Sequence, residues 1–401
     1  MTDLVIRALT TADSHDEYAD LSIRAFGPQD PAGVWPRTEA TIADGRGLGA
    51  FDDGRLIGTA LFHDLHQWWF GRAIPVAGVA SVKVAPEYRG RGAGRALMTA
   101  LTGLMTERGY ALSALYAATM PIYRQLGWEL AGASYEAVIP ARSLLALARP
   151  DFPAATARVP LRRPGPADAA EIIAVIGRAH QLARDCGPIT FSEPMVRSWL
   201  TAPGRYLDSG KFAYLAPDGF LAYRWNGSRK EIFIDKAVAA SPETALALWS
   251  VVASHSSIAG TIRARVAPSD PIWWLLREQD ATVGGRYRWM LRLLDAPAAI
   301  AARGFPLADL TVALHIRDDQ VPANAGHWNL AIRSGSAQLS PAPDSGSAAP
   351  LELGARGLAA LYAGTPVATL RRTGLAAGGT PDADLALDSA FAADAFMLDD
   401  F

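Results

Sequence analysis

A glycine-rich loop stands between a predicted strand and a predicted helix in segment 81–97, which reads SVKVAPEYRGRGAGRAL. Glycines let the backbone approach a ligand closely, and a helix start presents unpaired N–H groups and a partial positive charge. Flanking guanidinium groups add a charge that suits phosphate. The loop therefore predicts a pyrophosphate cradle made of six consecutive residues: Arg89, Gly90, Arg91, Gly92, Ala93 and Gly94.

A tyrosine near the middle of the N-terminal third is the candidate proton donor. Tyr123 stands four residues before Gly127, in a short segment that predicts a helix ending at that glycine. With an ordinary pKa near ~10, its hydroxyl is protonated at pH 7. The chain ends in AFMLDDF. Most chain ends fray, but the apolar residues of this one predict that it docks against the fold.

Residues 1–150 predict the α/β unit that must position these groups. Asp53-Gly54 is a favoured two-residue turn between two strands, and the apolar spacing of Arg95–Arg108 predicts the helix that follows the glycine loop. Ser134–Ile139 is expected to close the sheet of this unit.

Residues 151–289 repeat the order of the first unit weakly. A hairpin is predicted around Asp218-Gly219, and Ser241-Pro242 is a good helix start. No glycines precede that helix, so the segment predicts a second copy of the first fold that has lost its phosphate cradle. An unrelated α/β domain is the alternative.

Residues 290–401 change character and predict a third domain. A short helix is expected over 296–302 and alternating strands over 310–316 and 327–332. The Ser-, Pro-, Gly- and Ala-rich segment 335–349 is expected to be a loop.

The loop, with its Arg-x-x-Gly-x-Gly form after Val-Ala-Pro, resembles the acetyl-CoA loop of the GNAT superfamily of N-acetyltransferases. The whole chain resembles the enhanced-intracellular-survival (Eis) family, through the tandem units, the segment Ile122–Trp128 and the terminal Phe401. This resemblance implies an α/β (α+β) fold: two tandem GNAT acetyltransferase-like domains, 1–150 catalytic and 151–289 degenerate, and a sterol-carrier-protein-like domain, 290–401, whose C-terminus enters the active site. It also implies homo-hexamers built as a dimer of trimers.

The same resemblance implies an acetyl-CoA-dependent N-acetyltransferase of primary amines, among them aminoglycosides or polyamine-like compounds. Tyr123 would act as general acid and the main-chain carboxylate of Phe401 as general base. The backbone of Val82, Lys83 and Val84 would hold the pantetheine, as an added strand pairs with a sheet edge. Four residues are expected at the acceptor: Phe26, Trp35, Asp64 and Asp400.

Two departures from the family pattern concern the acceptor rather than the reaction. The residues before the tyrosine are Ala118–Pro121, where the family often has Ser-Glu-Gly, and Arg89–Gly92 replaces an often arginine-rich run. The aromatic run Trp68–Phe70 is expected to flank the acceptor cleft. A protein-lysine acetyltransferase and a non-catalytic CoA- or lipid-binding scaffold are the competing interpretations.

Bulk composition excludes several other classes. The formal net charge is −2 with 38 basic and 40 acidic residues, which provides no general attraction to nucleic acid or anionic membranes. One cysteine, Cys186, rules out an intrachain disulfide and a cysteine-based metal cluster, and the residues predict no metal. The N-terminus lacks the apolar core of a signal peptide, so a cytoplasmic location is expected.

Overall fold

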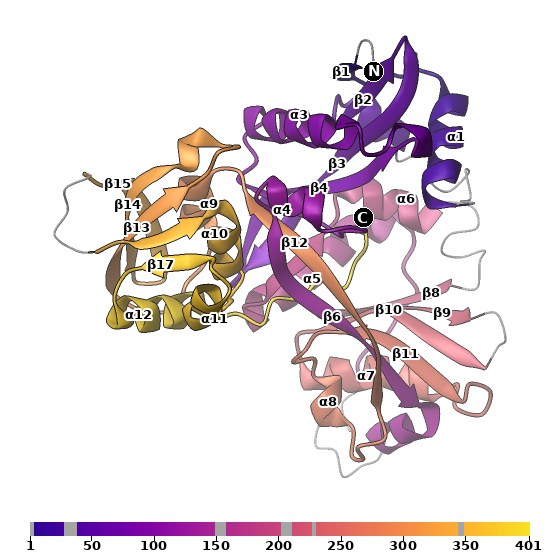
Figure 1. Ribbon diagram of the computed structural model, residues 1–401. Helices are drawn as coiled ribbons and strands as arrows, with labels where there is room; N and C mark the ends of the chain where they lie inside the picture. Colours follow the sequence, from indigo (N-terminus) through magenta and orange to yellow (C-terminus); the bar gives the residue numbers. More distant parts are fainter. Residues whose placement is uncertain (1–3, 28–37, 149–157, 202–210, 227–229, 344–348) are drawn as a thin grey trace.

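The computed structural model describes residues 4–27, 38–148, 158–201, 211–226, 230–343 and 349–401. Three lobes, one for each successive part of the chain, meet at a pair of long strands that cross the centre of the molecule (Figure 1). No helix among the described residues is long and apolar enough to span a membrane.

The first lobe contains the predicted glycine loop. Asp53 and Gly54 both have positive φ, as a two-residue hairpin turn requires, and they join β2 to β3. The helix after the glycine loop buries Leu97, Met98 and Leu101 against the sheet, which confirms its predicted amphipathic spacing. The elements are β1 (Leu4–Ala8), α1 (His15–Phe26), β2 (Gly47–Asp52), β3 (Arg55–Trp69), β4 (Arg72–Val84), α3 (Ala93–Glu107), β5 (Leu112–Leu115), α4 (Pro121–Gln125) and β6 (Glu129–Pro140).

The second lobe repeats this order. The predicted hairpin is present, but its turn residues are Pro217 and Asp218, because Gly219 already pairs with Ala216. Ser241 caps the helix that starts at Pro242 by accepting a hydrogen bond from the Thr244 backbone N–H. The elements are α5 (Ala169–Ala183), β7 (Cys186–Thr190), α6 (Glu193–Thr201), β8 (Lys211–Ala216), β9 (Gly219–Asn226), β10 (Glu231–Ala239), α7 (Pro242–Ala253), β11 (Thr261–Val266), α8 (Ile272–Leu275) and β12 (Thr282–Leu293).

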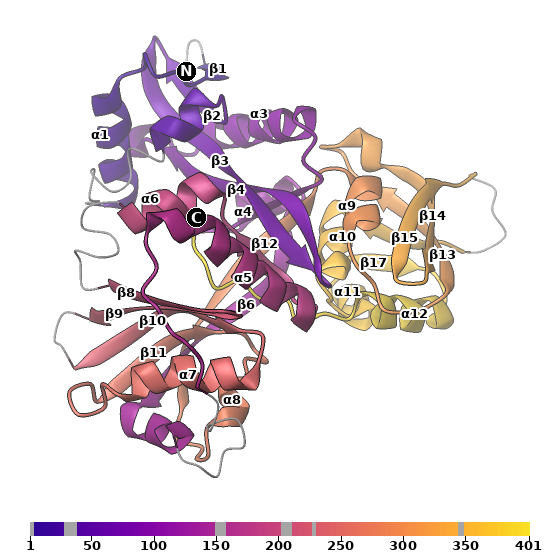
Figure 2. The same ribbon diagram turned by 180° about the vertical axis from the view of Figure 1, so that it is seen from behind.

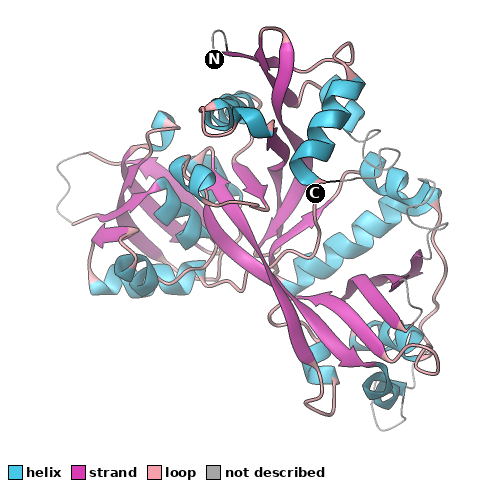
Figure 3. Ribbon diagram, turned by 45° about the vertical axis from the view of Figure 1, so that its right-hand side comes forward, coloured by secondary structure: helices cyan, strands magenta, loops and turns pink. Residues whose placement is uncertain are grey.

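Strands β6 and β12 join the two lobes into one 12-stranded sheet (Figure 3). They run antiparallel from the pair Glu129–Leu291 to the pair Val138–Thr282. The end of β12 also pairs with β5, whereas the second half of β6 pairs with β11. The expectation that Ser134–Ile139 closes the first sheet is therefore wrong, because β12 lies between β5 and β6 and each lobe is completed by a strand from the other segment.

The third lobe packs helices on a five-stranded sheet ordered β15-β14-β13-β16-β17. The predicted loop 335–349 contains a strand, because Ser334 and Gly335 make a turn with positive φ and Leu339 is buried between exposed Gln338 and half-buried Ser340. Residues 344–348 of this segment lie outside the described residues. The elements are α9 (Ala296–Ala302), β13 (Leu310–Arg317), β14 (Gly326–Arg333), β15 (Ser336–Pro341), β16 (Leu351–Gly354), α10 (Ala355–Tyr362), α11 (Val367–Arg372), β17 (Ala376–Gly378) and α12 (Pro381–Phe391).

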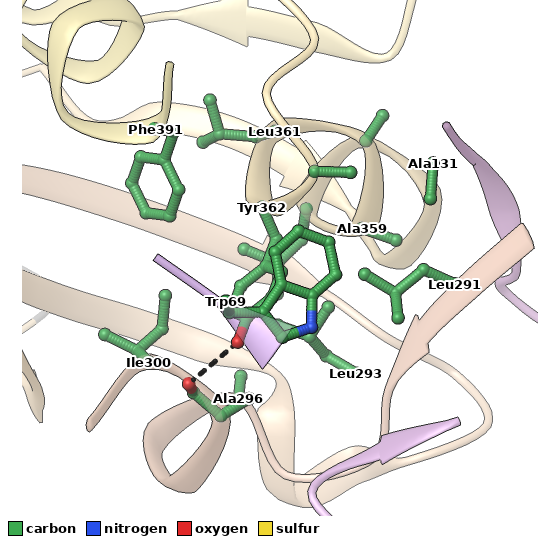
Figure 4. Close-up of a cluster of buried hydrophobic side chains, with 14 of the residues drawn as sticks. Trp69, Ala131, Leu291, Leu293, Ala296, Ile300, Ala359, Leu361, Tyr362 and Phe391 are labelled. Carbon is green, nitrogen blue, oxygen red and sulfur yellow. Dashed lines mark hydrogen bonds between the residues drawn. The ribbon is translucent and has the colours of Figure 1, made fainter. Parts of the chain in front are cut away.

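One apolar core joins the third lobe to the first (Figure 4). Trp69 is fully buried there, with its ring centroid 4.8 Å from that of Tyr362 and 6.2 Å from that of Trp289. The buried Arg292–Asp318 ion pair links β12 to the loop after β13, with an Nη2–Oδ1 distance of 2.6 Å. A buried ion pair of this kind holds two segments in one relative orientation.

Candidate active site

The glycine loop has the geometry that the sequence predicts for a phosphate cradle. Gly92 is the N-cap of α3 with φ of 89°, and Gly90 has φ of 75°, so both adopt a backbone conformation that L side chains rarely take. A Cβ atom at either position would meet no other atom within 4 Å, so both glycines face open space. The loop therefore fits a pyrophosphate that approaches the free N–H groups of α3.

Strand β4 bends beside this loop. Its pairing with β3 shifts register between Lys83 and Ala80, and Ser81 has φ of 52°. Within β4, only Val76–Gly78 pair with β5. Beyond Gly78 the two parallel strands separate, so the edge of β4 at Val82–Val84 has no strand partner on the β5 side among the described residues. An extended ligand that carries amide groups could pair with this edge.

Tyr123 lies in α4, directly after a residue that contacts the cradle. A Cβ atom at Gly94 would lie 3.4 Å from Ile122 Cδ1 and 3.5 Å from Val84 Cγ2, so α3, α4 and β4 converge at this point. The Tyr123 side chain is 7% exposed, and burial raises the pKa of its hydroxyl to about 12. Its hydroxyl has no hydrogen-bond partner among the residues that the structure describes, and it is therefore available to a ligand.

The chain end enters the fork between β4 and β5. A Cβ atom at Gly78, the last β4 residue paired with β5, would lie 2.8 Å from Phe401 Cδ2. The Phe401 ring centroid is 5.9 Å from that of Tyr116, which directly follows β5. Side chains alternate across a strand, so Gly78 faces away from Ala77 and Val79, which pack in the cluster that contains Tyr123. Phe401 and Tyr123 therefore lie on opposite faces of the sheet at the fork.

Two cations of the second lobe hold the tail that ends in Phe401. Lys236 Nζ lies 2.7 Å from Asp399 Oδ2, and Arg265 Nη2 lies 2.8 Å from Asp400 Oδ2. Figures 1 and 2 show the tail running between the first two lobes, with the C-terminus beside α6. Sequence reasoning did not identify these cations. The sequence did contain one indication of the Lys236 contact: Lys236 begins the otherwise apolar end of β10, and the tail carries two adjacent aspartates that could pair with a cation.

Backbone hydrogen bonds fix the tail before it reaches those cations. The Ala133 N–H donates to the Ala395 carbonyl over 3.1 Å, and the Phe396 N–H donates to the Cys186 carbonyl over 3.0 Å. The Tyr116 hydroxyl donates to the Met397 carbonyl over 3.1 Å. Met397 is fully buried, so the prediction that the chain end docks is confirmed.

Comparison with known proteins agrees with this arrangement. Models of an acetyltransferase (GNAT) domain match residues 5–131 and 197–293, and a sterol carrier protein domain model matches residues 296–398. A crystal structure of a GCN5-related N-acetyltransferase from Kribbella flavida is 41% identical, with a TM-score of 0.90, and the match covers 100% of this chain and 98% of that one. The chain belongs to the GCN5-related N-acetyltransferase family.

Its relatives include Eis proteins. The N-acetyltransferase Eis of Mycobacterium tuberculosis (strain ATCC 25177 / H37Ra) is 29% identical over 372 residues, which are 88% of this chain and 86% of that protein. Eis1 from Mycobacterium abscessus is 25% identical with a TM-score of 0.78, and each chain is covered completely. The predicted Eis-like N-acetyltransferase and its fold of two GNAT domains and a sterol-carrier-protein-like domain are confirmed, so an unrelated second domain is ruled out. GNAT acetyltransferases use acetyl-CoA as cosubstrate.

The residues predicted at the acceptor site of this N-acetyltransferase lie in different places. Asp400 lines a pocket between the second domain and the tail. Phe26 is 49% exposed at the end of α1, and Trp35 lies outside the described residues. Asp64 accepts a hydrogen bond from the Tyr110 hydroxyl over 2.9 Å, and it neighbours Leu65, whose side chain reaches the Phe401 face, so Asp64 faces the other way.

The aromatic run Trp68–Phe70 packs between domains. Trp69 belongs to the core shared with the third domain, and Trp68 Nε1 donates to Thr190 Oγ1 over 2.9 Å. The aromatic side chains that do line the pocket come from the second domain: Phe191, Trp199, Phe220 and Phe233.

Lys83 differs from the valines on either side of it. Val82 and Val84 pack toward α3, whereas Lys83 points to the opposite face, where its Nζ donates to Ser22 Oγ and lies 3.5 Å from the ring centroid of Tyr18. The residue is 4% exposed, and burial lowers the pKa of its ammonium group to about 7. Its side chain therefore belongs to the packing between α1 and β4, and only its backbone is at the free edge.

Proposed function

We propose that this N-acetyltransferase transfers the acetyl group of acetyl-CoA to a primary amine, with Tyr123 as the proton donor and the Phe401 carboxylate as the proton acceptor. The observation that carries the proposal is the position of Phe401 at the fork of β4 and β5, on the face opposite Tyr123. A thioester lying in the fork would meet the amine on the Phe401 side and release its sulfur toward the Tyr123 side.

The cradle and the free edge of β4 would hold the cosubstrate. Backbone N–H groups from Arg91 to Gly94 would bind the pyrophosphate, and Arg89 and Arg91 would add charge. The backbone of Val82–Val84 would pair with the pantetheine amides, and one N–H group there would polarise the thioester carbonyl.

Tyr123 would donate a hydrogen bond to the sulfur while the C–S bond breaks. A thiol has an ordinary pKa near ~8.5 and Tyr123 has a pKa of about 12, so complete transfer from tyrosine to a free thiolate costs about 5 kcal/mol. Tyr123 would therefore act in the transition state, where negative charge on the sulfur is still developing and a neutral, buried hydroxyl stabilises that charge.

The Phe401 carboxylate would attract the ammonium form of the acceptor and accept its proton, directly or through one water molecule. Two ion pairs, Lys236–Asp399 and Arg265–Asp400, would hold it in place. Loss of the proton frees the nitrogen lone pair, which attacks the acetyl carbon. The C–N bond would form as the C–S bond breaks, and the first ammonium proton would go to the carboxylate. The second surplus proton of the nitrogen would reach the departing sulfur through the Tyr123 hydroxyl, which gives up its own proton and is reprotonated, so that the amide and the CoA thiol leave neutral.

Aminoglycosides and polyamine-like compounds are the acceptors that the family resemblance suggests, and a protein lysine is the alternative. The experiment measures CoA release and acetylated product for an amine panel, using wild-type protein, Tyr123→Phe and a Phe401 deletion. We expect turnover in the wild type and loss of most of the rate in both variants, with acetyl-CoA binding retained. Full activity in the Phe401 deletion would overturn the assignment of the base.

The family resemblance also suggests a homo-hexamer built from two trimers. Mass determination by light scattering after gel filtration tests this assembly directly. A monomer at micromolar concentration would contradict it.

A further inference from the structure

A pocket of about 460 Å³ lies between the second domain and the C-terminal tail. Its volume is within the range of small-molecule sites. Leu398, Asp399 and Asp400 line one end, so the pocket reaches the residue that precedes Phe401. Much of its wall is apolar, with side chains from α5, α6, β9, β10 and the segment between β7 and α6. Four of these side chains are aromatic: Phe191, Trp199, Phe220 and Phe233.

The charged side chains of this wall neutralise one another. Arg224 Nε lies 3.1 Å from Asp235 Oδ1, which adds a third ion pair to Lys236–Asp399 and Arg265–Asp400. Among the described residues that line the pocket, three positive charges match three negative charges. The pocket wall therefore carries no net charge, and Phe401, the residue after Asp400, adds one further negative charge at the chain end.

We propose that the acceptor is a primary amine with one positive charge and an aromatic or long apolar body, which occupies this pocket. The inference rests on the proposed function and narrows its acceptor class. One ammonium group would pair with the Phe401 carboxylate, and the apolar body would cover the aromatic wall. A second or third ammonium group would enter a site whose aspartates already have cationic partners, so it would lose its hydration without gaining a counter-charge.

This acceptor differs from the polycations that the sequence suggested. That expectation counted Asp400 as negative charge available to a polyamine. In the structure its carboxylate pairs with Arg265, so an incoming ammonium group would compete with Arg265 for it; the Arg265 side chain is 13% exposed and the Asp400 side chain is 65% exposed.

The test compares four acceptors by kcat/KM at saturating acetyl-CoA. 2-Phenylethylamine has one charge and an apolar body, ethanolamine has one charge and a polar body, and spermidine and kanamycin are polycations. We expect 2-phenylethylamine to exceed each of the other three at least about tenfold. Equal or higher kcat/KM for spermidine or kanamycin overturns the charge argument, and equal or higher kcat/KM for ethanolamine overturns the apolar argument.

A charge variant tests the compensation itself. Arg224→Met removes one positive charge and keeps an unbranched apolar side chain over the Phe233 ring, which now lies 4.2 Å from the guanidinium carbon. We expect the preference for 2-phenylethylamine over spermidine to fall at least about threefold. The matched control is Arg317→Met, which breaks the exposed Arg317–Glu352 pair of the third domain and should change the preference less than about twofold.

These measurements distinguish a wrong acceptor class from a wrong proposed function. CoA release with polycations alone refutes the acceptor class and leaves N-acetyl transfer intact. No CoA release with any amine, by a protein that binds acetyl-CoA, refutes the proposed function together with this inference. An unchanged preference in Arg224→Met would show that charge compensation does not select the acceptor.

Discussion

Replacing Gly78 with alanine should displace the Phe401 ring and slow acetyl transfer. The added Cβ atom would lie 2.6 Å from Leu65 Cδ1 and 2.8 Å from Phe401 Cδ2. Carbon atoms pack at about 3.5–4.0 Å, so the ring must retreat by about 1 Å. Leu65 is fully buried, so its shift overpacks the core and lowers stability, whereas Phe401 is a half-buried chain end and yields more easily.

A displacement of about 1 Å in a positioned catalytic group costs about 100-fold in rate. We therefore expect Gly78→Ala to lower kcat about 100-fold, while overpacking lowers the free energy of unfolding by about 1–3 kcal/mol. The assay measures kcat, the Kd of acetyl-CoA by calorimetry and the thermal midpoint. Binding of acetyl-CoA should remain within about threefold of the wild type, because the pyrophosphate cradle is a separate site.

The matched control is Gly103→Ala in α3, where a Cβ atom meets nothing within 4 Å and alanine favours the helix. It should keep wild-type kcat and slightly raise the thermal midpoint. A folded Gly78→Ala variant with wild-type kcat would refute the claim that the position of Phe401 sets the rate.

Three further predictions follow from the same residues. Tyr123→Phe should lower kcat by a factor of about 10²–10⁴ with unchanged acetyl-CoA binding. Wild-type kcat should show no decline from tyrosine ionisation below pH 10, because the pKa of Tyr123 is about 12. A decline below pH 10 that disappears in Tyr123→Phe would contradict the predicted pH profile. The pKa of Lys83 falls from 10.5 to about 7 on folding, so the unfolded chain binds the extra proton and the free energy of unfolding should rise with pH between about 7 and 10.5. Urea titrations of Lys83→Met should lack this rise and give a free energy of unfolding that is higher at pH 7 by up to about 4 kcal/mol. Parallel pH profiles of the wild type and the variant would disprove the prediction. Lys236→Met leaves Asp399 without its cation and should release the tail, which lowers kcat at least about tenfold in steady-state assays. The control Arg317→Met should keep wild-type kcat. Wild-type kcat in Lys236→Met would show that the Lys236–Asp399 ion pair does not hold the base.

Local patterns in the sequence were enough to predict the backbone geometry of the proposed cofactor half of the site. The glycine loop, the helix after it and the Asp53-Gly54 hairpin depend on backbone conformations that short segments determine, and all three are present. The docking of the tail was also predictable, because Met397 and Leu398 are apolar residues that a frayed end would expose.

The acceptor half that we propose could not be predicted in the same way. Its wall comes from the second domain, and the exchange of β6 and β12 depends on pairing between residues more than 140 positions apart, such as Val138 and Thr282. Aromatic residues suit an inter-domain core and an acceptor cleft equally well, so the sequence could not distinguish Trp69 from Trp199. The charge balance of the pocket likewise depends on which cation meets which aspartate.

The most direct test of the central claim removes the terminal charge and nothing else. Semisynthesis can supply the full chain with Phe401 as a C-terminal amide, which keeps the ring, the tail contacts and the length. The account predicts that kcat for 2-phenylethylamine, or for the best acceptor found, falls at least about 100-fold while acetyl-CoA binding is unchanged. An amidated enzyme with wild-type kcat would contradict the assignment of the Phe401 carboxylate as the base.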